Sequence, residues 1–172
     1  ALKVLPQQMA AEPEFIGRFR QDAQVVARLQ HPHILPVFDF GDTDGYTYIV
    51  MPWVSGGTLA ARMSRGRLPW DEIIRLISQL GDALDYAHRL GLIHRDVKPS
   101  NVLIDEQGNC LLTDFGIAKL AESSARFTNT GGTVGTPTYM SPEQGRGLPV
   151  DGRTDVYALG VILFEMVVGR VP

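Results

Sequence analysis

The stretch His94-Arg95-Asp96-Val97-Lys98-Pro99-Ser100-Asn101 carries the most information about this protein. It places a carboxylate, an ammonium group and an amide close together in the chain. Asp114-Phe115-Gly116 follows eighteen residues after Asp96, Ser141-Pro142-Glu143 comes later, and Ala1-Leu2-Lys3 precedes them all. Each short motif alone occurs often by chance. Together and in this order, on predicted loops and strand ends, they indicate one functional site.

Five segments around these motifs are predicted to be strands. Residues 102–104 and 110–113, directly after the His94–Asn101 stretch, form a short pair joined by a polar turn. Residues 1–5 read as a strand that ends at a proline. Residues 34–40 and 46–51 are rich in aromatic and β-branched residues and flank a Gly- and Asp-rich turn, which predicts a hairpin.

Three segments have the apolar spacing of helices. The clearest is 71–90, which has Pro69 before it, acidic residues in its first turn and Gly91 after it. Its expected apolar face consists of Ile73, Ile74, Ile77, Leu80, Leu84 and Ala87. Residues 14–29 carry a less regular stripe. Residues 154–168 are apolar nearly all round, which predicts a buried helix.

The order of these elements predicts an α+β fold with two lobes. The strand-rich part comes first and the helix-rich part second, with a break near 52–57. We therefore expect a small first lobe and connecting segment over 1–54 and a mainly helical lobe over 55–172. Residues 121–137, rich in Ser, Thr and Gly, are expected to form a mobile loop in the second lobe.

Composition excludes several classes of protein. The 172 residues fit one domain, and 44% apolar with 20% charged residues is typical of a globular chain. A single cysteine, Cys110, excludes a disulfide scaffold and favours a reducing, intracellular setting. A formal charge of -3 argues against a nucleic-acid-binding surface spread over the domain.

The apolar stretch 156–168 is too short for a membrane span and contains Glu165, so a core helix is expected there. No secretory signal is recognisable. The chain starts without Met inside an expected strand, and it ends directly after an expected helix. We therefore expect a piece of a longer protein, truncated at both ends.

The four motifs closely resemble those of the eukaryotic-like serine/threonine protein kinases. The sequences of the loops and helices are more similar to those of the bacterial members. The resemblance covers essentially the whole chain, from the third strand of that fold to the helix after its activation segment. Ser141 departs from the usual alanine of the third motif. The resemblance implies a two-lobed protein-kinase-like fold that transfers the γ-phosphate of ATP to Ser or Thr hydroxyls of proteins.

The same resemblance implies a role for each residue of the motifs. Asp96 would orient the attacking hydroxyl, and Lys98 would reach the transferring phosphate and favour a Ser/Thr substrate. Asn101 and Asp114 would bind Mg²⁺, since both offer hard oxygen ligands. Lys3 would hold the α- and β-phosphates of ATP.

The adenine of ATP is expected at the segment that joins the two lobes. Met51 would stand at the back of the pocket, the Pro52 carbonyl and the Val54 N–H would bind the adenine, and Leu103 would line the site. Lys3 is expected to pair with a carboxylate on the first helix. Family spacing places Asp22 there, where the family usually has the longer Glu.

Other residues are expected to hold this site in place. Val26, Val37, His94 and Phe115 match the apolar stack that joins the lobes of the family. Asp155 matches an acid that anchors the backbone of the catalytic loop.

Regulation is expected through the activation segment. Arg95 and Lys119 would face it as unpaired cations, and phosphate on Thr128 or Thr130 would pair with both and order it. Phosphorylation in trans would need a dimer.

Two alternatives stay open. A pseudokinase, or nucleotide-binding scaffold, would need a lost essential residue, and only the Asp at position 22 favours it. A small-molecule kinase of related fold would lack a segment like residues 135–143. The expected partners are ATP and Ser/Thr-containing proteins, with no nucleic acid and no membrane contact within this fragment. We expect a cytoplasmic kinase domain within a full-length protein that could carry a membrane anchor.

Overall fold

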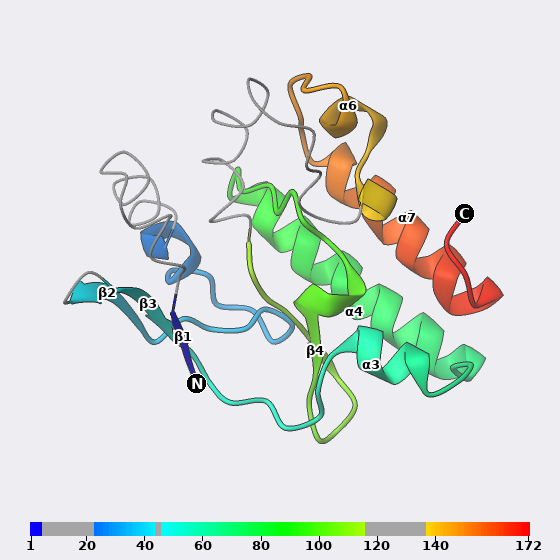
Figure 1. Ribbon diagram of the computed structural model, residues 1–172, viewed down its shortest axis with the longest axis horizontal. Helices are drawn as coiled ribbons and strands as arrows, with labels where there is room; N and C mark the ends of the chain where they lie inside the picture. The colour runs from blue at the N-terminus through cyan, green and yellow to red at the C-terminus, as the bar shows by residue number, and fades with distance from the viewer. Residues whose placement is uncertain (5–22, 44–45, 116–136) are drawn as a thin grey trace.

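The computed structural model describes residues 1–4, 23–43, 46–115 and 137–172. Strands dominate the first part of the chain and helices the second, as the sequence predicts. Figure 1 shows β1, β2 and β3 at one side of the molecule and the long helices α4 (Trp70–Arg89) and α7 (Arg153–Val168) at the other. The boundary between 1–54 and 55–172 stays a prediction.

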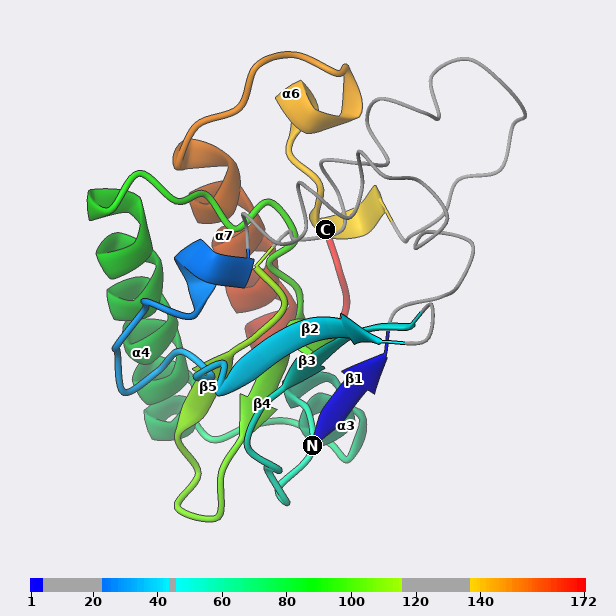
Figure 2. The same cartoon turned by 90° about the vertical axis from the view of Figure 1, so that its left-hand side faces the viewer.

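A three-stranded antiparallel sheet forms the first part. Its strands are β1 (Leu2–Val4), β2 (Asp39–Thr43) and β3 (Tyr46–Val50), in the spatial order β1-β3-β2. Lys3 lies opposite Ile49, and Ile49 lies opposite Phe40. Figure 2 shows β2 and β3 as one twisted ribbon with β1 beside it.

The predicted hairpin exists, but its first strand starts later than residue 34. Ile34 and Leu35 are buried, and they associate with the second part of the chain instead. Ile34 bridges Leu112 in parallel, and the Leu35 N–H donates to the Leu112 carbonyl at 2.9 Å. A β-branched run has no intrinsic preference for one partner strand, so the tertiary contact decided the pairing.

A second, two-stranded sheet consists of β4 (Val102–Ile104) and β5 (Cys110–Leu112), with Leu103 opposite Leu111. The prediction for this pair is correct to within one residue. Buried Val102, Cys110 and Leu112 join it to α4 in the central core. This pair supports the polar loops at its two ends.

Helix α4 forms as predicted, but one position of its expected face is wrong. Its buried residues are Ile73, Leu76, Leu80, Ala83, Leu84 and Ala87. Ile74 is 63% exposed. It follows Ile73 by one position and is therefore rotated about 100° away from the core.

Helix α7 packs along α4, as Figure 1 shows. Burial all round was predicted for it, and this is wrong for the described residues. Ala158, Val161, Ile162 and Met166 are buried, whereas Val156 is 60% exposed. An apolar composition on every face shows that a helix can be buried, but its neighbours decide which side is covered.

The short helix α3 (Leu59–Ser64) was not predicted. Thr58 caps it, since its hydroxyl accepts a hydrogen bond from the Ala61 N–H at 3.1 Å. A threonine before helix-favouring residues was the available signal. Of the predicted helix over 14–29, residues 23–29 are described. Residues 23–26 are helical, and the helix ends there, three residues earlier than predicted. In the described parts of the chain, no helix combines the length and hydropathy that a bilayer crossing requires.

Candidate active site

Three residues of the His94–Asn101 stretch meet at the Asp96 carboxylate. The Lys98 Nζ atom lies 2.8 Å from Asp96 Oδ2. The Asn101 Nδ2 atom donates to Asp96 Oδ2 at 3.0 Å and to the Asp96 carbonyl at 2.9 Å. Asn101 belongs to the 3-10 helix η1 (Pro99–Asn101) and is 7% exposed. Because its NH₂ group makes both bonds, its Oδ1 atom stays available as a ligand oxygen.

Asp114 and Lys3 meet at this site although 111 residues separate them in the chain. Lys3 extends from β1, and its Nζ atom lies 2.6 Å from Asp114 Oδ1. The Thr113 N–H donates to the Asn101 carbonyl at 2.9 Å, which ties the end of β5 to η1. Asp114 has a φ of 62°, a left-handed conformation that is uncommon for a residue with a side chain. The backbone therefore turns sharply where its carboxylate is presented.

A buried carboxylate on α7 holds the loop before Asp96. Asp155 is fully buried and accepts hydrogen bonds from the His94 N–H and the Arg95 N–H, each at 2.8 Å. The His88 Nε2 atom lies 2.8 Å from the same carboxylate. Asp155 thus anchors the loop backbone, as the sequence predicts, and His88 joins it without having been predicted to do so.

His94 is a packed structural histidine. Its ring lies 4.6 Å from that of Phe115, and both side chains are buried. Its Nε2 atom bonds the Thr113 carbonyl at 3.0 Å, and its Nδ1 atom accepts from the Asp96 N–H at 3.2 Å. Burial lowers the pKa of His94, which favours the neutral ring that these two bonds require. Val26 belongs to the same core cluster as Phe115, and Val37 packs against it.

The segment that joins the two parts runs close to β4. Gly56 lies so near the Ile104 carbonyl that an added Cβ would collide with it. The Gly57 carbonyl accepts from the Ile104 N–H at 2.9 Å, and Thr58 bridges Leu103. Leu103 is therefore fixed beside the segment that contains Met51, Pro52 and Val54. All four side chains are partly exposed.

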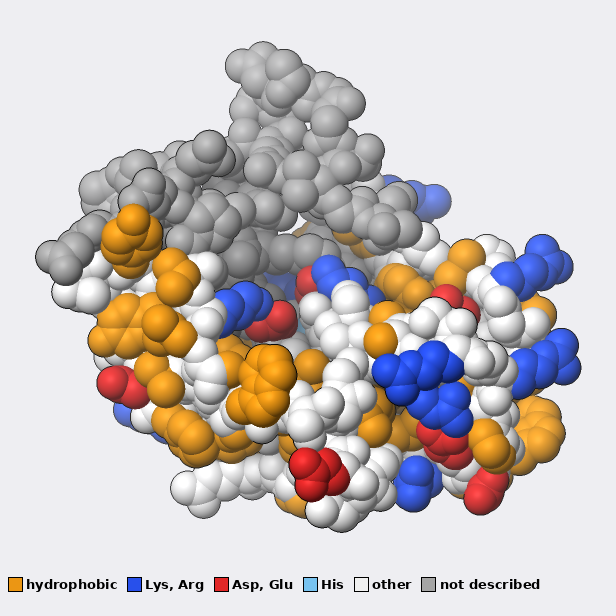
Figure 3. Space-filling view, turned by 60° about the horizontal axis from the view of Figure 1, so that its bottom comes forward, with side chains coloured by type: hydrophobic (Ala, Val, Ile, Leu, Met, Phe, Trp, Pro, Cys, Tyr) orange, Lys and Arg blue, Asp and Glu red, His pale blue; other side chains and the backbone are white. Residues whose placement is uncertain are grey.

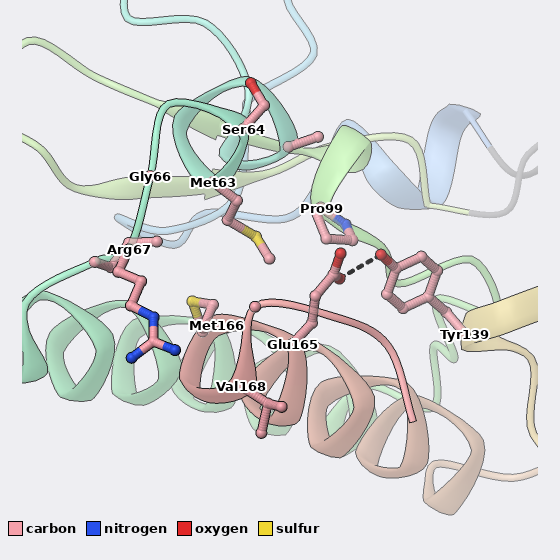
Figure 4. Close-up of a pocket in the computed structure, with 12 residues that line it drawn as sticks. Met63, Ser64, Gly66, Arg67, Pro99, Tyr139, Glu165, Met166 and Val168 are labelled. Carbon is pink, nitrogen blue, oxygen red and sulfur yellow. Dashed lines mark hydrogen bonds between the residues drawn. The ribbon is translucent and has the colours of Figure 1, made fainter.

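A pocket of about 510 Å³ lies next to Pro99 in the loop that carries Asp96. The sequence analysis did not predict this pocket. Figure 4 shows Tyr139 and Glu165 reaching toward each other next to Pro99. Tyr139 comes from the 3-10 helix η2 (Pro137–Tyr139), and its hydroxyl donates to Glu165 Oε2 at 2.5 Å. Partial burial, together with this bond, raises the pKa of Tyr139 above its ordinary value. The pair joins η2 to the end of α7.

The serine that replaces the usual alanine of the third motif has a structural role. Ser141 is the N-cap of the short helix α6 (Pro142–Gly145), and Gln144 completes a capping box with it. The Ser141 Oγ atom also lies 2.8 Å from Thr154 Oγ1 at the start of α7. Both hydroxyls are buried. The substitution therefore joins α6 to α7 by a bond that alanine cannot make.

Several predicted residues lie outside the described part of the chain. These are Asp22, the expected partner of Lys3, and the regulatory residues Lys119, Thr128 and Thr130. Arg95 is described and partly buried, and no ion pair of its guanidinium is found within the described residues. Among these residues, no group of three or more His, Cys, Asp or Glu side chains could hold a metal ion.

The sequence pattern of the protein kinase domain family matches residues 1–172. This chain belongs to the protein kinase domain family. Among curated relatives of this kinase domain, the serine/threonine-protein kinase PrkC of Bacillus subtilis is 43% identical over 173 residues. That alignment covers 100% of this chain and 26% of PrkC. PknA of Mycobacterium tuberculosis is 44% identical, over 100% of this chain and 41% of PknA.

Solved structures agree with the assignment of this kinase domain. The crystal structure of the Mycobacterium tuberculosis PknI kinase domain is 39% identical, with a TM-score of 0.80. The match covers 99% of this chain and 64% of that one. The fold is therefore that of a protein kinase, as the motifs indicated. The chain spans about a quarter of the length of the first curated relatives it matches.

Proposed function

We propose that this chain is the catalytic part of an ATP-dependent serine/threonine protein kinase. The convergence of Lys3, Asp96, Lys98, Asn101 and Asp114 on one site carries the proposal. Relatives that are 39–44% identical over the whole chain are named serine/threonine-protein kinases, which supports it.

The reaction makes one O–P bond and breaks another. The hydroxyl oxygen of a Ser or Thr side chain attacks the γ-phosphorus of ATP, ADP leaves, and the hydroxyl proton is released. Asp96 orients the hydroxyl and accepts this proton. Lys98, within an ion-pair distance of Asp96, compensates charge on the transferring phosphoryl group. Lys3 binds the α- and β-phosphates in place of the contact it makes with Asp114.

The donor atoms fit a magnesium ion that arrives with ATP. The Asn101 amide turns its NH₂ group toward Asp96, which leaves Oδ1 for a cation, and Asp114 supplies a carboxylate. Few protein ligands are typical of Mg²⁺, which keeps water and phosphate oxygens in its shell. When bound, the ion neutralises phosphate charge. Asn101 and Asp114 are its proposed ligands.

The adenine is proposed to bind at the segment that joins the two parts. Pro52 lacks an N–H but keeps its carbonyl, and Val54 supplies a carbonyl and an N–H. Met51 and Leu103 would supply apolar contacts to the adenine. The tie between Gly57 and Ile104 holds Leu103 next to this segment, which supports the proposal.

The proposed macromolecular partners are proteins that carry Ser or Thr. The pocket lined by Pro99, Tyr139 and Glu165 lies beside the loop that carries Asp96, which supports a binding surface for such a protein there. In the coloured part of the surface in Figure 3, basic side chains are mixed with acidic and apolar ones. This mixture does not favour nucleic acid, which attracts continuous basic surfaces. We place the domain in the cytoplasm.

We further propose that phosphate on Thr128 or Thr130 activates the kinase, with Arg95 and Lys119 as its cationic partners. Among the residues that the structure describes, no ion pair of the Arg95 guanidinium is found, which supports its availability for a phosphate. Transfer between two copies in a transient dimer would supply this phosphate.

The function is tested in the complete protein with ATP, Mg²⁺ and a generic Ser/Thr substrate. We expect Asp96→Asn and Lys3→Met each to lower phosphorylation by about 100-fold or more, because Asp96 orients the attacking hydroxyl and Lys3 binds the α- and β-phosphates of ATP. Asp85→Asn, on the exposed side of α4, is the matched control and should keep full activity. Full activity in Asp96→Asn would contradict the proposal, and ATP binding without phosphorylation by the wild type would favour the scaffold alternative.

A further inference from the structure

Arg95, the residue before Asp96, has an uncommon backbone conformation. Its φ is 66°, and Asp114 is the one other described non-glycine residue with a positive φ. This left-handed conformation costs free energy for a residue with a side chain, so the surrounding structure has to stabilise it. The conformation of Arg95 sets the direction in which the chain enters Asp96.

Both polar groups of the Arg95 backbone are held from outside the loop. Its N–H donates to Asp155 on α7 at 2.8 Å. Its carbonyl accepts from Gln144 Nε2 on α6, also at 2.8 Å. The second bond is the one that family resemblance did not lead us to expect. It links the segment after the activation loop directly to the peptide group that precedes Asp96.

Both the oxygen and the nitrogen of the Gln144 side-chain amide form hydrogen bonds. Its Oε1 atom accepts from the Ser141 N–H at 3.1 Å, which is the capping-box bond of α6. Its Nε2 atom donates to the Arg95 carbonyl. A glutamate could make the first bond equally well, since capping boxes use Glu or Gln. It could not make the second bond when ionised, because a carboxylate only accepts.

Packing does not replace this bond. A small cavity of about 20 Å³ lies where the loop meets α6 and α7, and Arg95, Asp96, Lys98 and Gln144 are among the residues that line it. Side chains therefore do not fill the space behind the loop completely. The direct hydrogen bond from Gln144 to the Arg95 carbonyl is therefore a directional contact at a place where packing is incomplete.

We infer that Gln144 is a positioning residue for Asp96 that acts through the Arg95 carbonyl. It couples the conformation of α6 to the geometry of the catalytic loop. The inference rests on the proposed kinase function, because Asp96 is the residue whose position is at stake. It assigns the amide nitrogen of Gln144 a role that the helix cap alone does not require.

The test substitutes Gln144→Glu in the complete protein, which keeps the cap acceptor and removes the donor. Gln79→Glu is the matched control. The Gln79 amide also donates, to Asn109 Oδ1 at 2.9 Å, and accepts, from the Cys110 N–H at 2.9 Å, but it lies at the far end of β5. The measurements are kcat, the KM for ATP, the melting temperature, and hydrogen exchange of the peptide that covers residues 94–101.

We expect Gln144→Glu to lower kcat by about tenfold with little change in the KM for ATP, since a small displacement of Asp96 affects the transition state most. Exchange over 94–101 should become about fivefold faster, as loss of one hydrogen bond implies. Gln79→Glu should change neither kcat nor this exchange.

Unchanged kcat and unchanged exchange in Gln144→Glu would overturn the inference, and so would equal losses of kcat in the two variants. If the wild type itself transfers no phosphate, the proposed function fails, and the exchange measurement still decides whether Gln144 positions the loop.

Discussion

Lys3 and Asp114 illustrate how a contact can matter for function and little for stability. The two side chains are 46% and 34% exposed, so water and salt screen the 2.6 Å ion pair. Pairs of this kind contribute about 0–1 kcal/mol to folding. Their value lies in placing an ammonium and a carboxylate where phosphate and a cation are expected to bind.

The predicted partner of Lys3 is Asp22, and this pairing stays a prediction. Lys3 contacts Asp114 in the structure, so Asp22 would have to compete for the same ammonium group. We expect Asp22→Glu to leave turnover equal or higher, because the longer side chain reaches further. Asp22→Ala should lower kcat/KM for ATP about tenfold, mainly by raising the KM, since the phosphate-binding lysine loses a partner. Steady-state kinetics of the complete protein measure both.

Glu14→Ala, in the same segment, is the control for this series and should have little effect. If Asp22→Ala turns over ATP and substrate as fast as wild type, Asp22 is not the partner of Lys3.

At the scale of elements, close approach of backbones decides how the two parts are joined. Helix α3 begins at Thr58, directly after the Gly56-Gly57 pair that lies against Ile104 at the end of β4. Gly57 has a φ of +82°. A short loop with one left-handed residue and one residue without room for a Cβ therefore sets the position of the joining segment beside Leu103.

This geometry predicts opposite effects of one substitution at two glycines. Gly56→Ala should lower the free energy of unfolding by about 1–3 kcal/mol, because the new Cβ forces the segment away from the Ile104 carbonyl. Gly81→Ala should raise it by about 0.5–1 kcal/mol, since Gly81 lies within α4 with open space around its Cβ position. Denaturant unfolding of both variants measures the difference. Equal stability of the two variants would show that the approach at Gly56 is not restrictive.

At the scale of the whole molecule, the proposed regulation connects residues 121–137, which the sequence predicts to be a loop, with the site. Two cations, Arg95 and Lys119, are expected to face that loop. A phosphothreonine carries about -1.5 to -2 charges and three acceptor oxygens, so it can pair with both. Because Gln144 and Asp155 hold the backbone of Arg95, ordering its side chain would also restrain the entry to Asp96.

Mass spectrometry of the active protein should find phosphate on Thr128 or Thr130. The double change Thr128→Ala with Thr130→Ala should lower kcat/KM toward an added substrate by roughly tenfold, because the charge-assisted bonds to the two cations are lost. Thr133→Ala, in the same segment, is the control and should keep most of the activity. Full activity without phosphate at either position would contradict this mode of regulation.

The sequence by itself determined the family, the α+β class and most of the helices and strands. The motif His94–Asn101 is local, because Asp96, Lys98 and Asn101 lie within six consecutive residues. The periodicity of α4 and the turn between β4 and β5 are local as well. Each depends on residues a few positions apart, and the chain sequence states those directly.

Tertiary structure decided the features that depend on distant neighbours. Ile34 pairs with Leu112 and not with a hairpin partner, and the exposed side of α7 reflects what packs on it. Gln144 reaches Arg95 across 49 residues, and Tyr139 reaches Glu165 across 26. No local pattern encodes these contacts, because a Gln in a capping box or an apolar helix looks the same in sequence wherever it packs. Long-range packing alone selects which of the locally allowed partners is met.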